Sequence, residues 1–160
     1  MTNLNQLIIK FDYEQNFKDD DFYVSNSNQH IFKLLNQWPK WGKNFLNING
    51  EKFSGKSHLA KIFIKKFKGI KLEANSLSEE SLKMVKLHEN VILENLSKQI
   101  NEKLFYSLLN IIDLDNKFII ITSEKPIVDI EFELSDLKSR AKNFLLQKIE
   151  KPDDELMFAL

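Results

Sequence analysis

A glycine-rich stretch, residues 50–57, carries the residue types that bind phosphate groups. It reads GEKFSGKS, so two glycines lie five positions apart and the second is followed by lysine and serine. This is the spacing of a loop that wraps around phosphates, because glycines let successive N–H groups point at an anion. A lysine adds a mobile positive charge, and a small hydroxyl group can bind Mg²⁺. The stretch predicts a polyphosphate site, whose expected contact residues are Gly50, Ser54, Gly55, Lys56, Ser57 and His58.

This stretch also allows two interpretations that involve no ligand and no catalysis. The glycines can form a tight turn that leaves a lysine on the surface. His58 fits a structural role at the start of a helix better than a catalytic one. Because His30 and His88 lie in unrelated contexts, we expect no histidine metal cluster and no catalytic triad.

The segments on either side of the stretch match what such a loop requires. Residues 44–50 run from apolar side chains into a glycine and predict a short strand. Residues 57–67 predict an amphipathic helix. Its apolar face carries Leu59, Ile62, Phe63 and Phe67. Strand, loop and helix in this order favour the phosphate-binding interpretation.

The rest of the chain alternates in the same way. Apolar runs predict strands over residues 69–74, 90–96, 117–126 and 144–150. Apolar side chains at helical spacing predict helices over residues 27–38, 76–87, 101–114 and 133–144. We expect Pro39 to end the first of these helices and Ser76 or Ser78 to cap the second. Five strands that alternate with helices predict an α/β fold, a five-stranded parallel sheet with helices on both faces.

The composition limits the kinds of protein that the chain can be. Its 160 residues carry 23 Lys and Arg against 23 Asp and Glu, so charge alone predicts no general affinity for nucleic acid. The absence of cysteine excludes disulfides and thiolate metal sites. No window approaches about 18 apolar residues, and the first residues lack a signal-peptide pattern. We therefore expect a cytoplasmic protein with no membrane association.

Polar residues stand at the ends of two predicted strands, where ligands of such sheets bind. Glu94 follows an apolar run, and we expect it to hold Mg²⁺ together with Ser57. Ser123 and Glu124 end the next strand, where a polar group can sense a terminal phosphate. The alternatives are an ordinary acid at a strand end for Glu94 and simple turn residues for the other two.

Four segments resemble the DnaA-type branch of the AAA+ ATPases. GKSHLA (55–60) is similar to that branch's GKTHLA, and DFYVSNSN (21–28) to its NFVVGxSN segment near the nucleotide. IITSEKP (120–126) resembles its sensor-one motif LTSDRPP, and DLKSR (136–140) resembles its arginine-finger box RLxSR. The matches follow the family's order over nearly the whole chain.

The resemblance implies a P-loop AAA+ core that binds ADP or ATP with Mg²⁺. It adds Tyr23 and Val24 to the expected nucleotide contacts. It also gives Arg140 the role of a finger that acts on ATP held by an adjoining subunit. The alternative for Arg140 is a solvated arginine on a basic helix surface.

The chain departs from the family's pattern at two positions of the expected site. Phe53 stands where the family's loop has its middle glycine, and phenylalanine does not easily adopt a positive φ. Asn95 stands at the catalytic position of the second acid, which polarises the attacking water. An amide does not take up a proton as a carboxylate does. We therefore expect feeble intrinsic hydrolysis.

The family's core is followed by a small helical lid, and the sequence stops at Leu160 without one. The expected organisation is a flexible leader over residues 1–18 and an AAA+ core over residues 19–160 that lacks the lid. Without the lid, one wall of the nucleotide site is missing, so we expect a lower affinity.

Within the branch, the sequence is most similar to the Hda-type regulators, which inactivate the replication initiator. QLIIKF (6–11) lies where these proteins carry a sliding-clamp motif of the form QLxLPL. The resemblance implies that Gln6 hydrogen-bonds to the clamp and that Leu7, Ile9 and Phe11 fill its hydrophobic pocket. The alternative is an edge strand of the domain itself.

The implied partners are the DnaA initiator and the DNA polymerase sliding clamp, with DNA contacted only indirectly. The alternative function is an autonomous P-loop ATPase or a helicase-loader-like protein that acts on DNA. It would need a catalytic carboxylate beside Glu94 and a basic surface, which Asn95 and the zero net charge disfavour. A small-molecule kinase would need an arginine-rich lid, and Arg140 is the single arginine of the chain.

Overall fold

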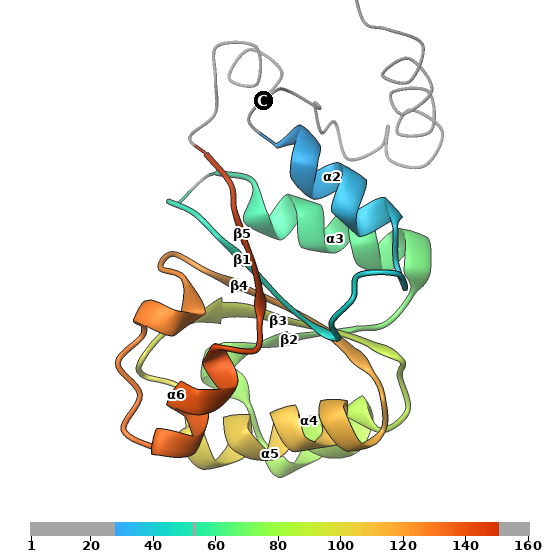
Figure 1. The fold of residues 1–160 in the computed structure, drawn as a ribbon. Coiled ribbons are helices and arrows are strands. Elements are labelled where there is room, and N and C mark those ends of the chain that lie inside the picture. The colour runs from blue at the N-terminus through green and yellow to red at the C-terminus, as the bar shows by residue number, and fades with distance from the viewer. Residues whose placement is uncertain (1–27, 53, 151–160) are drawn as a thin grey trace, which may run out of the picture.

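The structure, a computed structural model, describes residues 28–52 and 54–150, which form one sheet between two layers of helices (Figure 1). The strands are β1 (Phe45–Asn49), β2 (Ile70–Glu73), β3 (Asn90–Leu96), β4 (Phe118–Ser123) and β5 (Leu145–Lys148). The α-helices are α2 (Gln29–Asn36), α3 (Lys56–Phe67), α4 (Glu79–Val85), α5 (Glu102–Leu114) and α6 (Ser135–Ala141). Short 3₁₀ turns η2 (Ala74–Ser76) and η3 (Ile127–Asp129) follow β2 and β4.

The sheet is parallel throughout, in the order β2-β3-β4-β1-β5. This confirms the predicted α/β fold with five parallel strands. Helices α2 and α3 cover one face of the sheet, and α4, α5 and α6 cover the other (Figure 1). Strand β1, which leads into the predicted phosphate loop, lies between β4 and β5.

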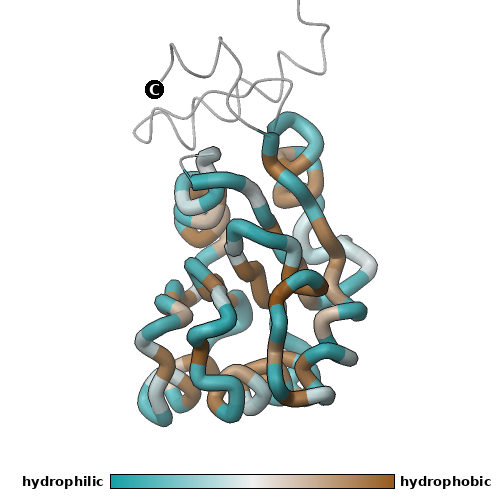
Figure 2. Tube along the Cα trace, turned by 90° about the vertical axis from the view of Figure 1, so that its left-hand side faces the viewer, coloured by the Kyte–Doolittle hydropathy of each residue, from teal (hydrophilic) through white to brown (hydrophobic). Residues whose placement is uncertain are grey.

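Alternate residues of the central strands pack against opposite helix layers, because successive side chains of a strand point to opposite faces. On β3, Ile92 belongs to the core beneath α2 and α3, whereas Val91 and Leu93 belong to the core beneath α4, α5 and α6. On β4, Ile120 and Ile121 divide in the same way. Both faces of these strands are covered, which explains their continuous apolar sequences. The hydrophobic segments accordingly run through the interior of the molecule (Figure 2).

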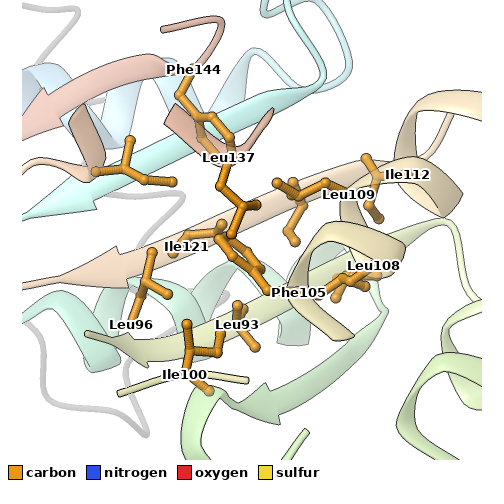
Figure 3. Close-up of a cluster of buried hydrophobic side chains, with 14 of the residues drawn as sticks. Leu93, Leu96, Ile100, Phe105, Leu108, Leu109, Ile112, Ile121, Leu137 and Phe144 are labelled. Carbon is orange, nitrogen blue, oxygen red and sulfur yellow. The ribbon is translucent and has the colours of Figure 1, made fainter. Parts of the chain in front are cut away.

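The core beneath α4, α5 and α6 is built around the apolar face of α5 (Figure 3). Its largest contributors from α5 are Phe105, Leu108, Leu109 and Ile112, all at most 1% exposed. Leu137 from α6 and Phe144, which follows α6, belong to the same cluster (Figure 3). This core holds α6 against α5 and against the sheet.

Helix boundaries differ from the predictions by a few residues. Helix α2 ends at Asn36 and residues 37–39 form a turn, because the residue before a proline disfavours helical backbone. Helix α6 occupies only the middle of the predicted segment. Ser78 caps α4 by accepting a hydrogen bond from the N–H of Ser81, which settles the choice between the two predicted caps. No helix in the described ranges is both long and apolar enough to cross a membrane.

Several predicted residues lie outside the described ranges. They are the clamp-motif residues Gln6, Leu7, Ile9 and Phe11, the nucleotide contacts Tyr23 and Val24, and Phe53 of the loop.

Candidate functional site: a cleft beside the loop after β1

The loop after β1 is closely packed at the carboxyl edge of the sheet. The N–H of Gly50 donates to the carbonyl of Ser123, 3.1 Å away. A Cβ at Gly50 would lie 2.4 Å from Ile149 Cγ2 and 2.9 Å from Ser54 Oγ, so no larger residue fits there without movement. Gly55 has a φ of +103° at the N-cap of α3, a conformation that favours glycine. One glycine of the motif is therefore required by space and the other by its backbone.

Lys56 is the first residue of α3, and its side chain folds back over the loop. Its ammonium group donates to the carbonyl oxygens of Gly50 and Glu51, both at 2.7 Å, and lies 3.4 Å from Ser54 Oγ. Burial lowers the pKa of this ammonium group, and the charge of Glu124 opposes that effect. The ammonium group of Lys56 is thus bound by neutral oxygens of the loop. An anion can replace these oxygens as its partner.

The first turn of α3 faces the same space. The N-cap of α3 is Gly55, which has no side chain that could cap the helix, and the first N–H groups of a helix have no acceptor within the helix itself. The helix dipole also makes this end positive. Ser57 is exposed and His58 is half-buried, and both line the cleft next to Lys56. This end of α3 can therefore receive a phosphate group.

A cleft of about 1030 Å³ opens beside the loop. It is lined by the loop and the first turn of α3, and by residues at or after the ends of β2, β3 and β4, among them Asn75, Asn95 and Glu124. The cleft lies where the carboxyl ends of parallel strands meet, the usual ligand position in open α/β sheets. Its volume is sufficient for a nucleotide.

Glu94, next to Asn95 on β3, is not among the residues that line this cleft. The residue is 4% exposed, and its Oε2 lies 3.7 Å from the ammonium group of Lys71 on β2. Oε1 is buried and has no hydrogen-bond partner among the described residues. Such an oxygen is costly to leave unpaired, and Mg²⁺ or a water bound to it would satisfy it. The carboxylate of Glu94 therefore fits a Mg²⁺ ion, and the hydroxyl of Ser57, which lines the cleft, is a second candidate ligand.

Further ligands of such an ion would have to come from phosphate and water. Among residues 28–52 and 54–150, no group of three or more His, Cys, Asp or Glu side chains is arranged to hold a metal. Mg²⁺ usually keeps several waters and binds through one or two carboxylates together with substrate phosphates. The carboxylate of Glu94 and the hydroxyl of Ser57 fit this kind of coordination and are too few to hold a metal ion without phosphate and water.

Asn95 lines the cleft in a left-handed backbone conformation, with φ of +62°. Its N–H donates to Thr122 Oγ1 at 3.1 Å, and its side-chain Nδ2 donates to both carboxylate oxygens of Glu73, at 3.0 and 3.3 Å. The pairing of β3 with β4 shifts register between Leu93 and Leu96, so the ladder is interrupted at Asn95. Glu73 was not among the predicted site residues. Its position at the end of a strand was the signal that could have found it.

Of the two predicted sensor residues, only Glu124 lines the cleft. Ser123 is buried; its Oγ donates to the carbonyl of Lys125 at 2.5 Å and accepts from Asn47 Nδ2 at 3.0 Å. Asn47 also donates to a β4 carbonyl at 3.0 Å and accepts from the N–H of Ile127 at 2.8 Å. Asn47, which was not predicted, therefore joins β1 to the turn after β4 that carries Glu124.

Arg140 lies away from the cleft and packs against α5. Its guanidinium group donates to Asn110 Oδ1 and, at 3.5 Å, to the carbonyl of Leu109, and it lies 5.3 Å from the centre of the Tyr106 ring. The structure thus gives Arg140 partners within its own chain. Its predicted role as a finger for another subunit stays a prediction.

Comparisons with known proteins identify the fold. No family model and no curated protein matches the sequence. Among solved structures, AMPPCP-bound DnaA from Aquifex aeolicus is 21% identical with a TM-score of 0.70, over 86% of this chain and 51% of that one. Domain III of DnaA from Thermotoga maritima is 20% identical with a TM-score of 0.63, over 86% and 68% of the two chains. DnaI is 14% identical with a TM-score of 0.61, over 80% and 84%.

These similarities show that the chain has the α/β fold of the DnaA structures. The chain spans about half the length of the Aquifex aeolicus protein. The fold class predicted from the sequence is therefore confirmed.

Proposed function

We propose that this chain binds ADP or ATP with Mg²⁺ and acts as an Hda- and DnaA-like regulator of the initiation of chromosomal replication. The observation that carries nucleotide binding is the loop around Lys56. There a buried ammonium group, the start of a helix and a left-handed glycine meet at a cleft of nucleotide size. Each of these three features favours a bound polyphosphate.

On binding, the ammonium group of Lys56 exchanges its contacts with Gly50 and Glu51 for phosphate oxygens. The first N–H groups of α3 donate to the same phosphates, and Ser57 and Glu94 would hold Mg²⁺. The ion would neutralise charge on the phosphate oxygens. Asn95 faces the cleft without a group that can take a proton, so the bound ATP is hydrolysed feebly.

As a regulator, the chain acts on ATP bound to a neighbouring DnaA initiator subunit. Arg140 stabilises the charge that develops on the transferred phosphoryl group, an effect worth roughly 10³–10⁵ in rate for arginine fingers. To do so its guanidinium group must leave Asn110 and Tyr106 on α5. The leader docks on the DNA polymerase sliding clamp through Gln6, Leu7, Ile9 and Phe11, so DNA is contacted only indirectly.

The test measures ATP hydrolysis by the initiator in the presence of clamp loaded on DNA. We expect the wild-type chain to accelerate it, Arg140→Ala to abolish the acceleration, and Lys138→Ala, an exposed lysine on the same helix, to leave it intact. Undiminished stimulation by Arg140→Ala would remove the finger role.

Clamp docking is tested separately by a pull-down with the sliding clamp. We expect the wild-type chain to be retained and the double variant Gln6→Ala, Leu7→Ala to be lost. Equal retention of both proteins would show that Gln6 and Leu7 do not mediate binding to the clamp.

A second candidate is an autonomous P-loop ATPase or helicase-loader-like protein that acts on DNA. It is favoured by the likeness to DnaI, of which the match covers 84% of the chain, compared with 51% for the Aquifex aeolicus DnaA. Appreciable ATP turnover by the purified chain alone, increased by DNA, would favour this function over the regulator.

A further inference from the structure

Glu73 and Asn95 form a hydrogen-bonded pair across the ends of β2 and β3. Both carboxylate oxygens of Glu73 receive hydrogen bonds from Asn95 Nδ2, at 3.0 and 3.3 Å. An ionised carboxylate only accepts, so only the NH₂ side of the amide can face it. The carbonyl oxygen Oδ1 of Asn95 must therefore point away from Glu73. It is the remaining polar atom of a side chain that lines the cleft.

The backbone of Asn95 supports this orientation. Its φ of +62° takes the residue out of the strand conformation, and its N–H is held by Thr122 Oγ1 at 3.1 Å. The residue is thus anchored on β4 through its backbone and on β2 through its side chain. The two contacts with Glu73 are the side-chain hydrogen bonds that orient this solvent-exposed amide.

We propose that Glu73 is a positioning residue, which fixes the Asn95 amide with Oδ1 toward the cleft. This inference rests on the proposed nucleotide binding. In the strand order β2-β3-β4-β1, the carboxylate of Glu73 lies one strand farther than Asn95 from the loop after β1. The position at which the sequence resemblance implies an acid thus carries an amide, and a carboxylate lies beside it on the neighbouring strand. Water beside the terminal phosphate meets an oriented acceptor that does not take its proton.

A double variant, Glu73→Gln with Asn95→Asp, swaps the positions of the carboxylate and the amide. It keeps one carboxylate, one amide and an N–H···O contact between them, but it moves the carboxylate to the cleft. In ATP hydrolysis the water oxygen bonds to the terminal phosphorus, the bond to the bridging oxygen breaks, and the carboxylate takes the water's proton. A positioned general base contributes typically 10²–10⁴-fold. We expect the double variant to hydrolyse Mg-ATP about 10²-fold faster than the wild type at saturating nucleotide.

The single variants are the matched controls for that experiment. Glu73→Gln alone leaves no carboxylate at this pair and should not raise the rate. Asn95→Asp alone sets two carboxylates against each other, so we expect a smaller gain than in the double variant. A double variant that binds Mg-ATP as the wild type does but hydrolyses it no faster would overturn the proposal.

A second readout needs no nucleotide. The NH₂ signals of Asn95 in an NMR spectrum are assigned by their loss in Asn95→Asp, and their hydrogen exchange with solvent is compared among variants. We expect Glu73→Ala to speed that exchange at least several-fold, and Glu131→Ala, another acid at the cleft, to leave it unchanged. Equal exchange in the wild type and Glu73→Ala overturns the pairing whether or not nucleotide binds. Slow, Glu73-dependent exchange in a wild type that binds no nucleotide refutes the proposed function instead.

Discussion

Replacing Gly50 by alanine tests how closely the phosphate loop is packed on the residue after β5. The added Cβ would lie 2.4 Å from Ile149 Cγ2 and 2.8 Å from Ile149 O, whereas carbon atoms in contact lie about 3.5–4.0 Å apart. The overlap with Cγ2 is therefore about 1 Å. Ile149 is 1% exposed, and its N–H donates to the carbonyl of Asn49 at 2.8 Å. A change of rotamer relieves only the first contact, so the loop itself must move.

Overpacking of this kind destabilises by about 1–3 kcal/mol, which lowers Tm by roughly 2–12 °C in a domain of this size. Scanning calorimetry measures that change, and titration calorimetry should show Mg-ADP binding weakened at least ten-fold, or about 1.4 kcal/mol. The control is Gly42→Ala. Gly42 has a φ of +83° and no heavy atom within 4 Å of its Cβ position, so it should lose about 1 kcal/mol of stability to backbone strain and no affinity. Unchanged Tm and affinity in Gly50→Ala would refute the role given to this packing.

Three further predictions concern the supports of the site. Glu102 accepts a hydrogen bond from the N–H of Leu134, the N-cap of α6, at 2.9 Å. Glu102→Ala should therefore lower the free energy of unfolding by about 1 kcal/mol and speed amide hydrogen exchange in α6. Glu102→Gln, which keeps an acceptor, should change both quantities less. Asn47→Leu leaves the N–H of Ile127 unpaired and should lower that free energy by about 1–3 kcal/mol in urea unfolding. A stability equal to wild type would exclude the joining role of Asn47. Because the pKa of Lys56 in the folded chain lies below its usual 10.5, the unfolded chain binds more protons between those two values. The contribution of Lys56 to stability therefore rises with pH across that window. In urea unfolding measured from neutral pH to about pH 10.5, Lys56→Met should show a smaller rise in stability than the wild type. An identical pH dependence in the two proteins would contradict this prediction.

The sequence was sufficient for the parts of the site that depend on local pattern. Apolar runs located all five strands, and the glycine spacing located the loop, because backbone turns and burial are set by neighbouring residues. Lys56, Ser57 and His58 follow directly, since they belong to the helix that the loop begins.

The parts that depend on strand order and register were not predictable in this way. Glu73 meets Asn95 only because β2 pairs with β3 in a register that aligns Glu73 with Glu94. Asn47 is 74 positions from the β4 carbonyl that it bonds, and its value as a buried donor appears only when β1 lies beside β4. Arg140 was assigned from a motif, and a motif does not show that the side chain also has partners on α5.

The central claim is that the loop around Lys56 binds a nucleotide, and calorimetric titration with Mg-ADP tests it most directly. We expect saturable one-to-one binding by the wild-type chain, binding at least ten-fold weaker by Lys56→Ala, a loss of about 1.4 kcal/mol, and wild-type affinity in Lys103→Ala, an exposed lysine of α5. No binding by the wild-type chain, or equal affinity in Lys56→Ala, would contradict the claim.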